Sequence, residues 1–302
     1  MRGLNRRYED IKRIKGVRWL LLWVMLTQFV LRVLVAAIVS FIPKGGEGFE
    51  RYSNYIQLGV ITTLTFLISI VVYGVTAWRK TEKADAEEMR FNRFSGKLTS
   101  FIVVMAISGQ FVMALLNLPM ERIVGAHKGG LVPYSGGEVV VALLGTAIIP
   151  GIFEEFWMRG IVLGVYERRS TFVAIFFTTI MFALMHGSLS KLPGVLLLGF
   201  VAAIITIRTN SVYAAMLYHI LNNATSVLFG YIAVNYNIGD GFVWTFSAIM
   251  TLVFMASFVC FLAVSPKRAR NKCPGEGAML LKNFLSLPVI LCLILVCFKI
   301  KF

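Results

Sequence analysis

Long apolar runs separated by short charged or glycine-rich segments extend over most of the chain. A run of about 20 apolar residues can cross the roughly 30 Å hydrocarbon core of a bilayer as an α-helix. The pattern therefore predicts an all-α fold, a polytopic transmembrane helix bundle of about eight spans, or nine if the short last run also crosses. The expected spans are 17–42, 55–78, 100–119, 139–166, 171–188, 192–208, 211–233, 242–264 and 284–298.

Composition agrees with this prediction. Of the 302 residues, 58% are hydrophobic and only 15% are charged, and the mean hydropathy of +0.77 lies outside the range of ordinary soluble domains. The net charge of +15 comes from Lys and Arg in the segments between apolar runs. Such segments orient a protein in a membrane, so we expect no nucleic acid as partner and a lipid bilayer as surroundings.

The distribution of basic residues also predicts the orientation. With alternating spans, most Lys and Arg fall on the side of the N-terminus, so the positive-inside rule places the N-terminus in the cytoplasm. The basic N-terminal segment leads into an apolar run too long for a cleaved signal peptide, and we interpret it as a retained first span. The compact length and short loops favour a multi-pass protein of a bacterial plasma membrane.

The cysteines show no pattern of a metal site or a disulfide framework. Cys260, Cys273, Cys292 and Cys297 all lie in the last fifth of the chain, without a CxxC pair and without a histidine nearby. Structural zinc sites and disulfide scaffolds usually show closer or more regular spacing. The cysteines therefore do not indicate a chemical function.

The stretch "GIFEEFWMRG" puts Glu154, Glu155 and Arg159 inside a predicted span. Each charge at the bilayer centre costs at least about 2.5 to 3.5 kcal/mol, so such residues usually face the bundle interior and mark a site. Glu155 and Arg159 are four residues apart and share one helix face in the favourable order for an ion pair. Glu154 points about 100° away. One carboxylate thus looks structural, and Glu154 is available as a general base or acid.

Two further spans carry histidines. His186 follows Phe182 by one helical turn, so the ring can pack against the imidazole, which could act as base, relay or metal ligand. His219 and Asn223 are also four residues apart, and either could donate a hydrogen bond to an oxyanion. Arg32 in the first span fits a structural charge or a lipid-facing side chain, and the sequence indicates no role for it.

Each of these features has an ordinary structural explanation as well. The EExxxR pattern alone could be a salt-bridge cluster between helices, and a single intramembrane histidine can simply bond a backbone carbonyl. Their occurrence on three helices within a short segment favours one common site. For them to meet, residues 139–166, about 40 Å long at 1.5 Å per residue, must form a tilted helix with Glu154 near mid-depth, and Pro150 is the expected position of a kink.

Together, "EEFWMR", "FALMH" and "HILNN" resemble the motifs of the CPBP family of intramembrane proteases. This family, also called Abi, comprises CAAX proteases and bacteriocin-processing enzymes and is related to the CAAX prenyl protease 2 type of endopeptidase. Its pattern is EExxxR, then FxxxH, then HxxxN or HxxxD on successive helices. All three motifs are complete here, in the family's order, within about residues 139–230.

The resemblance implies a set of roles. Glu154 with His186 would activate the attacking water, His219 with Asn223 would stabilise the oxyanion, and Glu155 with Arg159 would hold the site together. The family has been described both as zinc-dependent and as metal-independent. If Zn²⁺ is present, its ligands would be Glu154, His186 and His219, with water in the fourth position. The chain has no HExxH, GxSG or GxGD motif of other intramembrane proteases.

The resemblance therefore predicts an intramembrane endopeptidase acting on membrane-associated peptides or proteins. Two alternatives remain open: a non-catalytic membrane scaffold or regulator of the same family, and a proton-coupled transporter, for which the chain lacks an internal repeat. The predicted organisation is three N-terminal spans in 1–138, a catalytic core in 139–233, and a C-terminal part with a basic loop in 234–302.

Overall fold

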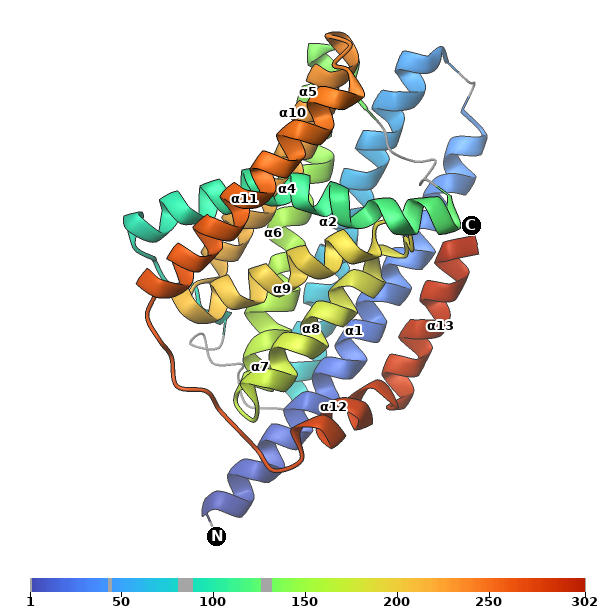
Figure 1. Ribbon diagram of the computed structural model, residues 1–302. Helices are drawn as coiled ribbons and strands as arrows, with labels where there is room; N and C mark the ends of the chain where they lie inside the picture. The colour runs from blue at the N-terminus through green and yellow to red at the C-terminus, as the bar shows by residue number, and fades with distance from the viewer. Residues whose placement is uncertain (1, 43–44, 81–88, 126–131, 302) are drawn as a thin grey trace.

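The computed structural model describes residues 2–42, 45–80, 89–125 and 132–301, and within these ranges all regular secondary structure is helical (Figure 1). The prediction of an all-α fold is confirmed. The helices are α1 (Arg2–Ser40), α2 (Glu47–Lys80), α4 (Gly96–Val124), α5 (Gly136–Ala142), η1 (Leu143–Ile148), α6 (Ile149–Glu155), η2 (Phe156–Val162), α7 (Leu163–Glu167), α8 (Thr171–His186), α9 (Leu192–Thr209), α10 (Val212–Asn235), α11 (Asp240–Val264), α12 (Glu276–Phe284) and α13 (Leu287–Lys301).

By length and composition, six helical segments in the described part of the chain could cross a membrane, or seven if α12 and α13 form one broken span. The sequence predicts eight or nine spans, which is roughly this number. The difference has physical reasons: α8 has 16 residues, which is short for a span, and α12 and α13 are bent by 57°. The middle of α10 carries polar His219, Asn222 and Asn223 and so is less apolar than its neighbours. The cytoplasmic position of the N-terminus stays a prediction.

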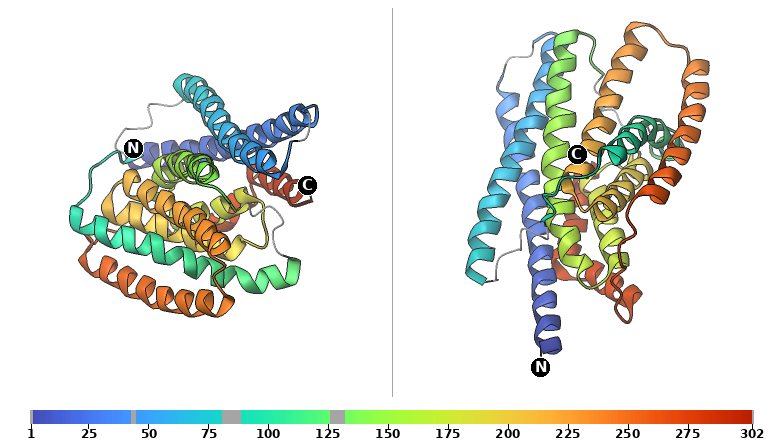
Figure 2. Two further views of the ribbon diagram at one scale, coloured as in Figure 1. Left: turned by 90° about the horizontal axis from the view of Figure 1, so that it is seen from above. Right: turned by 90° about the vertical axis from the view of Figure 1, so that its left-hand side faces the viewer.

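The helices pack in layers (Figure 2). Seen from above, α4 and α11 lie side by side on one flank, and α1 and α2 lie on the other. The run from α5 to α7 and the helices α8, α9 and α10 fill the space between these flanks. This interior holds much of the buried apolar cluster, including Ile102, Met105, Phe177 and Ala202. Polar side chains that project from the middle helices are therefore removed from lipid.

The long run from Gly136 to Glu167 is helical throughout and confirms the predicted helix over 139–166. Two of its segments, η1 and η2, are π-helical and flank the short α-helix α6. Pro150 is the second residue of α6, just after η1, and a proline in the first turn of an α-helical segment is tolerated because an N–H is not needed there. The run therefore continues through Pro150. π-Helical segments inside longer helices often occur at functional sites.

The start of this run is held to α2. Ser135 accepts a hydrogen bond from the backbone N–H of Glu138, and the Glu138 carboxylate accepts one from the backbone N–H of Tyr134. The same carboxylate forms an ion pair of 3.0 Å with Arg51 of α2. Capping of this kind satisfies N–H groups that a helix start leaves unpaired. These contacts position the start of the helical run that carries Glu154 and Glu155.

Candidate active site

The three sequence motifs come together inside the bundle. Glu154 and Glu155 end α6, Arg159 lies one turn further in η2, His186 is the last residue of α8, and His219 lies in α10. Two contacts link these elements: Glu154 with His186, and Glu155 with His219. The expectation that the helices meet at a common depth agrees with these contacts.

Glu155, Arg159 and His219 form a fully buried cluster. The Glu155 Oε1 atom accepts a hydrogen bond from Arg159 at 3.1 Å, as the four-residue spacing predicts, and one from the Nδ1 atom of His219 at 2.8 Å. Glu155 and Arg159 are 0% exposed and His219 is 1% exposed. Arg159 also donates to the carbonyl of Gly199 in α9 at 2.9 Å. The Glu155 carboxylate thus connects α6 to η2 and α10, and the Arg159 guanidinium adds α9.

Phe182 packs against all three motifs. Its ring lies 4.8 Å from the His186 ring and 5.6 Å from the His219 ring, both in edge-on geometry. The Arg159 guanidinium lies over the same ring at 4.4 Å from its centroid. A cation over an aromatic face is attracted by the ring's quadrupole. The sequence predicts the packing of Phe182 on His186, whereas its contacts with Arg159 and His219 come from the structure alone.

Glu154 and His186 form the more accessible half of the site. The Nε2 atom of His186 lies 3.8 Å from the Oε2 atom of Glu154, and the two side chains are 31% and 25% exposed. The Nδ1 atom of His186 lies 2.9 Å from the carbonyl oxygen of Phe182. A carbonyl only accepts, so Nδ1 donates to it, and in the neutral form of the ring Nε2 faces Glu154 with its lone pair. A separation of 3.8 Å exceeds a direct hydrogen bond, and one water can bridge such a gap.

The two asparagines of α10 bond to backbone carbonyls of neighbouring helices. Asn223 donates to the carbonyl of Thr146 in η1 at 3.0 Å and is half-buried. Asn222 is fully buried and donates to Ala106 of α4 at 3.1 Å. An amide group has two N–H donors, so Asn223 can keep this bond and donate a second one. Asn222 has a structural contact that the family motif does not include.

Arg32 lies near the site, although the sequence indicates no role for it. It is a half-buried residue of α1, and its charge attracts that of Glu154. The Nε atom of Arg32 and the Oε2 atom of Glu154 are both buried without a hydrogen-bond partner in the described part of the protein. The sequence shows only that Arg32 is a charged residue within a predicted span. It does not reveal which helix the Arg32 side chain faces.

The residues expected to bind Zn²⁺ belong to two separate pairs. Glu154 contacts His186, and Glu155 rather than Glu154 contacts His219. Among the described residues, no three His, Cys, Asp or Glu side chains gather closely enough to hold a metal ion. The arrangement in the structure therefore does not fit a three-ligand zinc site formed by Glu154, His186 and His219.

Fold and site together define an all-helical, multi-pass membrane protein with carboxylate–imidazole pairs inside the bundle. Residues 136–225 match the family model described as Rce1-like, type II CAAX prenyl endopeptidase. This match confirms the resemblance to the CPBP family of CAAX proteases, whose members are peptide-bond hydrolases acting at membranes. No curated protein and no solved structure gives a significant match to the chain.

Gly151 allows α10 to approach α6 next to the site. A Cβ atom added at Gly151 would lie 2.5 Å from Cγ1 of Ile220 and 3.1 Å from its backbone nitrogen. Ile220 directly follows His219, so any displacement of α10 moves the imidazole. The absence of a side chain at Gly151 therefore sets the distance between the two helices.

Gly151→Ala should consequently destabilise the protein by about 1 to 3 kcal/mol, because overpacking forces helices apart. The effect is measured as thermal unfolding in detergent. Gly160→Ala is the matched control, since its added Cβ would meet its nearest neighbour, the carbonyl oxygen of Met89, at 3.7 Å. Equal stability of the two variants would show that the approach of α6 and α10 is not tight.

Proposed function

We propose that the chain is an intramembrane endopeptidase that hydrolyses a peptide bond in a membrane-associated peptide or protein. The observation that carries this proposal is the pairing of partly exposed Glu154 with His186 directly beside the buried Glu155–Arg159–His219 cluster. A partly exposed carboxylate thus lies next to a buried, hydrogen-bonded cluster. The match to a CAAX endopeptidase model over the same residues supports the same reaction class.

In the proposed mechanism, a water between Glu154 and His186 gives its proton to the Glu154 carboxylate. The resulting hydroxide attacks the carbonyl carbon of the scissile bond and forms a tetrahedral oxyanion. Glu154 then passes the proton to the leaving nitrogen, the C–N bond breaks, and a carboxylic acid and an amine result. The Nε2 atom of His186 helps to orient the water, because its Nδ1 atom is occupied by the Phe182 carbonyl.

The oxyanion would be stabilised from α10. His219 donates through Nδ1 to Glu155, and its imidazolium form would also present an Nε2–H donor to the oxyanion. The second N–H of Asn223 can supply another donor while the first remains bonded to Thr146. Glu155 and Arg159 are then positioning residues, since they orient His219 without touching substrate.

Arg32 has a role in this mechanism that can be tested. The Arg32 guanidinium attracts the Glu154 carboxylate, so it would help to position the proposed base. Arg32→Gln is expected to lower the cleavage rate about tenfold, because this attraction is lost. Arg32→Lys, which keeps the charge, should retain most of the activity. An Arg32→Gln variant that cleaves as fast as the wild-type protein would contradict this role.

A metal chelator tests the two descriptions of the family directly. The proposed mechanism uses side chains alone, a proposal supported by the lack of three gathered donors among the described residues, so 1,10-phenanthroline is expected to leave the cleavage rate unchanged. Loss of activity that is restored by Zn²⁺ but not by Mg²⁺ would contradict this expectation. It would indicate that Glu154, His186 and His219 act as zinc ligands.

The proposed activity can be tested with purified full-length protein in proteoliposomes. A peptide that ends in a farnesylated CAAX sequence serves as the first probe, since the matching family model describes CAAX prenyl endopeptidases. Wild-type protein should release the C-terminal tripeptide, and His186→Ala should not. Cleavage at equal rates by both proteins would refute the proposal, and cleavage of an unprenylated matched peptide at the same rate would show that the prenyl group is not recognised.

A further inference from the structure

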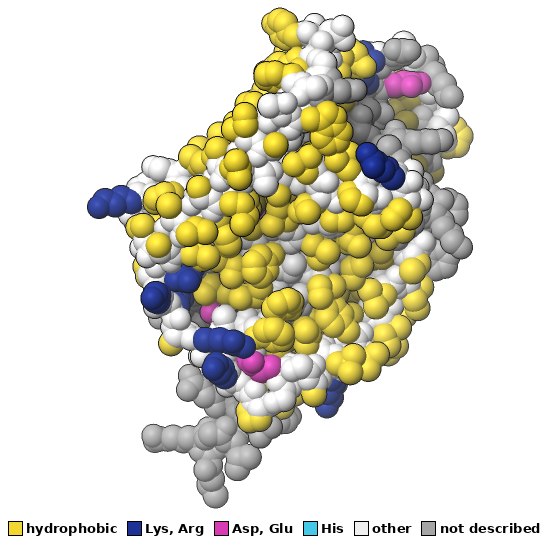
Figure 3. All heavy atoms as spheres, in the orientation of Figure 1, with side chains coloured by type: hydrophobic (Ala, Val, Ile, Leu, Met, Phe, Trp, Pro, Cys, Tyr) yellow, Lys and Arg dark blue, Asp and Glu magenta, His cyan; other side chains and the backbone are white. Residues whose placement is uncertain are grey.

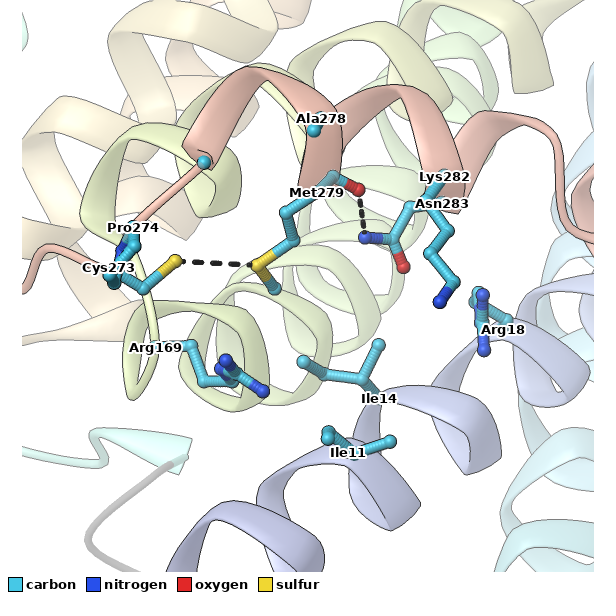
Figure 4. Close-up of a pocket in the computed structure, with 11 residues that line it drawn as sticks. Ile11, Ile14, Arg18, Arg169, Cys273, Pro274, Ala278, Met279, Lys282 and Asn283 are labelled. Carbon is cyan, nitrogen blue, oxygen red and sulfur yellow. Dashed lines mark hydrogen bonds between the residues drawn. The ribbon is translucent and has the colours of Figure 1, made fainter.

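A cavity lies at the end of the bundle near the N-terminus (Figures 1 and 4), and none of the glutamates and histidines of the candidate active site line it. It has a volume of about 360 Å³ and is bounded by the first part of α1, by Arg169 just after α7, and by α12 with the residues that precede it. Three cationic side chains line it, Arg18, Arg169 and Lys282. The family match ends at residue 225 and thus does not include α12.

The three cations lack anionic partners. In the described part of the chain, none of Arg18, Arg169 and Lys282 forms a side-chain hydrogen bond or an ion pair, and the Nε atom of Arg18 is buried without a partner. The nearby carboxylate of Glu276 is already bonded to Ser170 and Arg270. Figure 4 shows Arg18 and Lys282 extending towards each other across the cavity. Like charges placed in this way repel unless an anion lies between them.

These side chains lie near the ends of apolar helices, where the headgroup level of a membrane is expected. Arg18 stands at the start of the apolar run of α1, and Arg169 follows the end of the helical run Gly136–Glu167. Lys282 belongs to α12, which lies across this end of the bundle before the chain bends into α13 (Figure 1). On the face shown in Figure 3, apolar side chains cover the middle, and most Lys and Arg gather towards this same end.

Apart from Asn283, the rest of the lining is mainly apolar. Ile14, Ala278 and Met279 contribute side chains to the cavity, and Met279 is held in place by a contact with Cys273. Asn283 is fixed by bonds to Tyr166 and to the carbonyl of Met279, so α12 is tied to α7 beneath the cavity. A free inorganic anion would gain nothing from the apolar side chains, whereas the glycerol backbone and first methylenes of a lipid would cover them.

We propose that this cavity binds the headgroup of an anionic phospholipid, with the phosphate between Arg18, Arg169 and Lys282 and the glycerol backbone over Ile14 and Met279. Basic pockets between helices at a membrane surface are suited to such headgroups. If the N-terminus is cytoplasmic, as the basic residues predict, the lipid comes from the inner leaflet. Binding would fix α12 against α1 and α7 at the end of the bundle.

The test is native mass spectrometry of full-length protein extracted from vesicles of equimolar phosphatidylglycerol and phosphatidylcholine. Wild-type protein is expected to retain one phosphatidylglycerol in preference to phosphatidylcholine. The triple variant Arg18→Gln, Arg169→Gln, Lys282→Gln should reduce that retention about tenfold or more, because each basic side chain near the headgroup adds attraction. The charge-conserving variant Arg18→Lys, Arg169→Lys, Lys282→Arg should retain the lipid.

The matched control removes the same charge elsewhere. Lys12, Lys15 and Lys267 are exposed and do not line the cavity, so their replacement by Gln should change retention by less than about twofold. Equal loss in both triple variants, or equal retention of the two lipids by wild-type protein, would overturn the proposal. Displacement of the lipid by inorganic phosphate would also overturn it and show a small-anion site. Circular dichroism of each variant checks that the fold is intact.

Discussion

Glu154→Gln is expected to lower the cleavage rate by about 10² to 10⁴-fold, the range that a positioned general base contributes. The amide has nearly the shape of the carboxylate but cannot accept the proton of the attacking water. Its contact with His186 at 3.8 Å lies in the partly exposed half of the site, so the substitution leaves the buried cluster in place. The measurement compares initial rates of the two proteins in proteoliposomes.

The control for this variant is Glu50→Gln, which removes the same charge from an exposed position at the start of α2. Its rate should equal that of the wild-type protein. Thermal unfolding of Glu154→Gln should also match the wild-type curve, because the carboxylate makes no hydrogen bond through its buried Oε2 atom. An active Glu154→Gln variant would show that another group activates the water.

Arg159→Met is expected to destabilise the protein by about 3 to 5 kcal/mol, because it leaves the Glu155 carboxylate buried without its cation. Arg159 and Glu155 are both 0% exposed, and the guanidinium also bonds the Gly199 carbonyl and covers the Phe182 ring. The substitution therefore removes several contacts among η2, α8 and α9 at once. The measurement is the free energy of unfolding in mixed detergent micelles.

A second substitution separates lost pairing from lost packing. Glu155→Leu combined with Arg159→Met removes both charges, and the double variant should be more stable than Arg159→Met alone, since no unpaired carboxylate remains. Arg122→Met is the control for loss of an arginine, because Arg122 is exposed in the last turn of α4. A double variant less stable than Arg159→Met would contradict the interpretation of Glu155 and Arg159 as a buried ion pair.

The sequence predicts the all-helical fold and the meeting of the three motifs, because apolar run length and four-residue spacing are local properties of a helix. The pair formed by Glu155 and Arg159 follows from that spacing and is present in the structure. The number of spans is harder to predict, since α12 and α13 are apolar together but bent between them. The proposed domain division and the catalytic roles stay predictions.

The partners between helices could not be predicted in this way. Helical spacing shows that His219 and Asn223 share a face, but not that His219 bonds Glu155 or that Asn223 bonds Thr146. Those contacts depend on how α10 is rotated against α6 and η1. Gly151 lets α10 approach α6 at Ile220, but its place in the sequence does not reveal that neighbour. The proximity of Arg32 to Glu154 likewise depends on the packing of α1, which lies outside the segment with the family motifs.

The central claim, hydrolysis of a peptide bond that depends on Glu154, can be tested without knowing the substrate. Membranes containing either wild-type protein or Glu154→Gln are incubated in H₂¹⁸O, and the peptides are analysed by mass spectrometry. We predict new C-terminal carboxylates that carry one ¹⁸O atom in the wild-type sample and are lost from the variant sample. The same labelled peptides in both samples would contradict the claim and favour a non-catalytic scaffold.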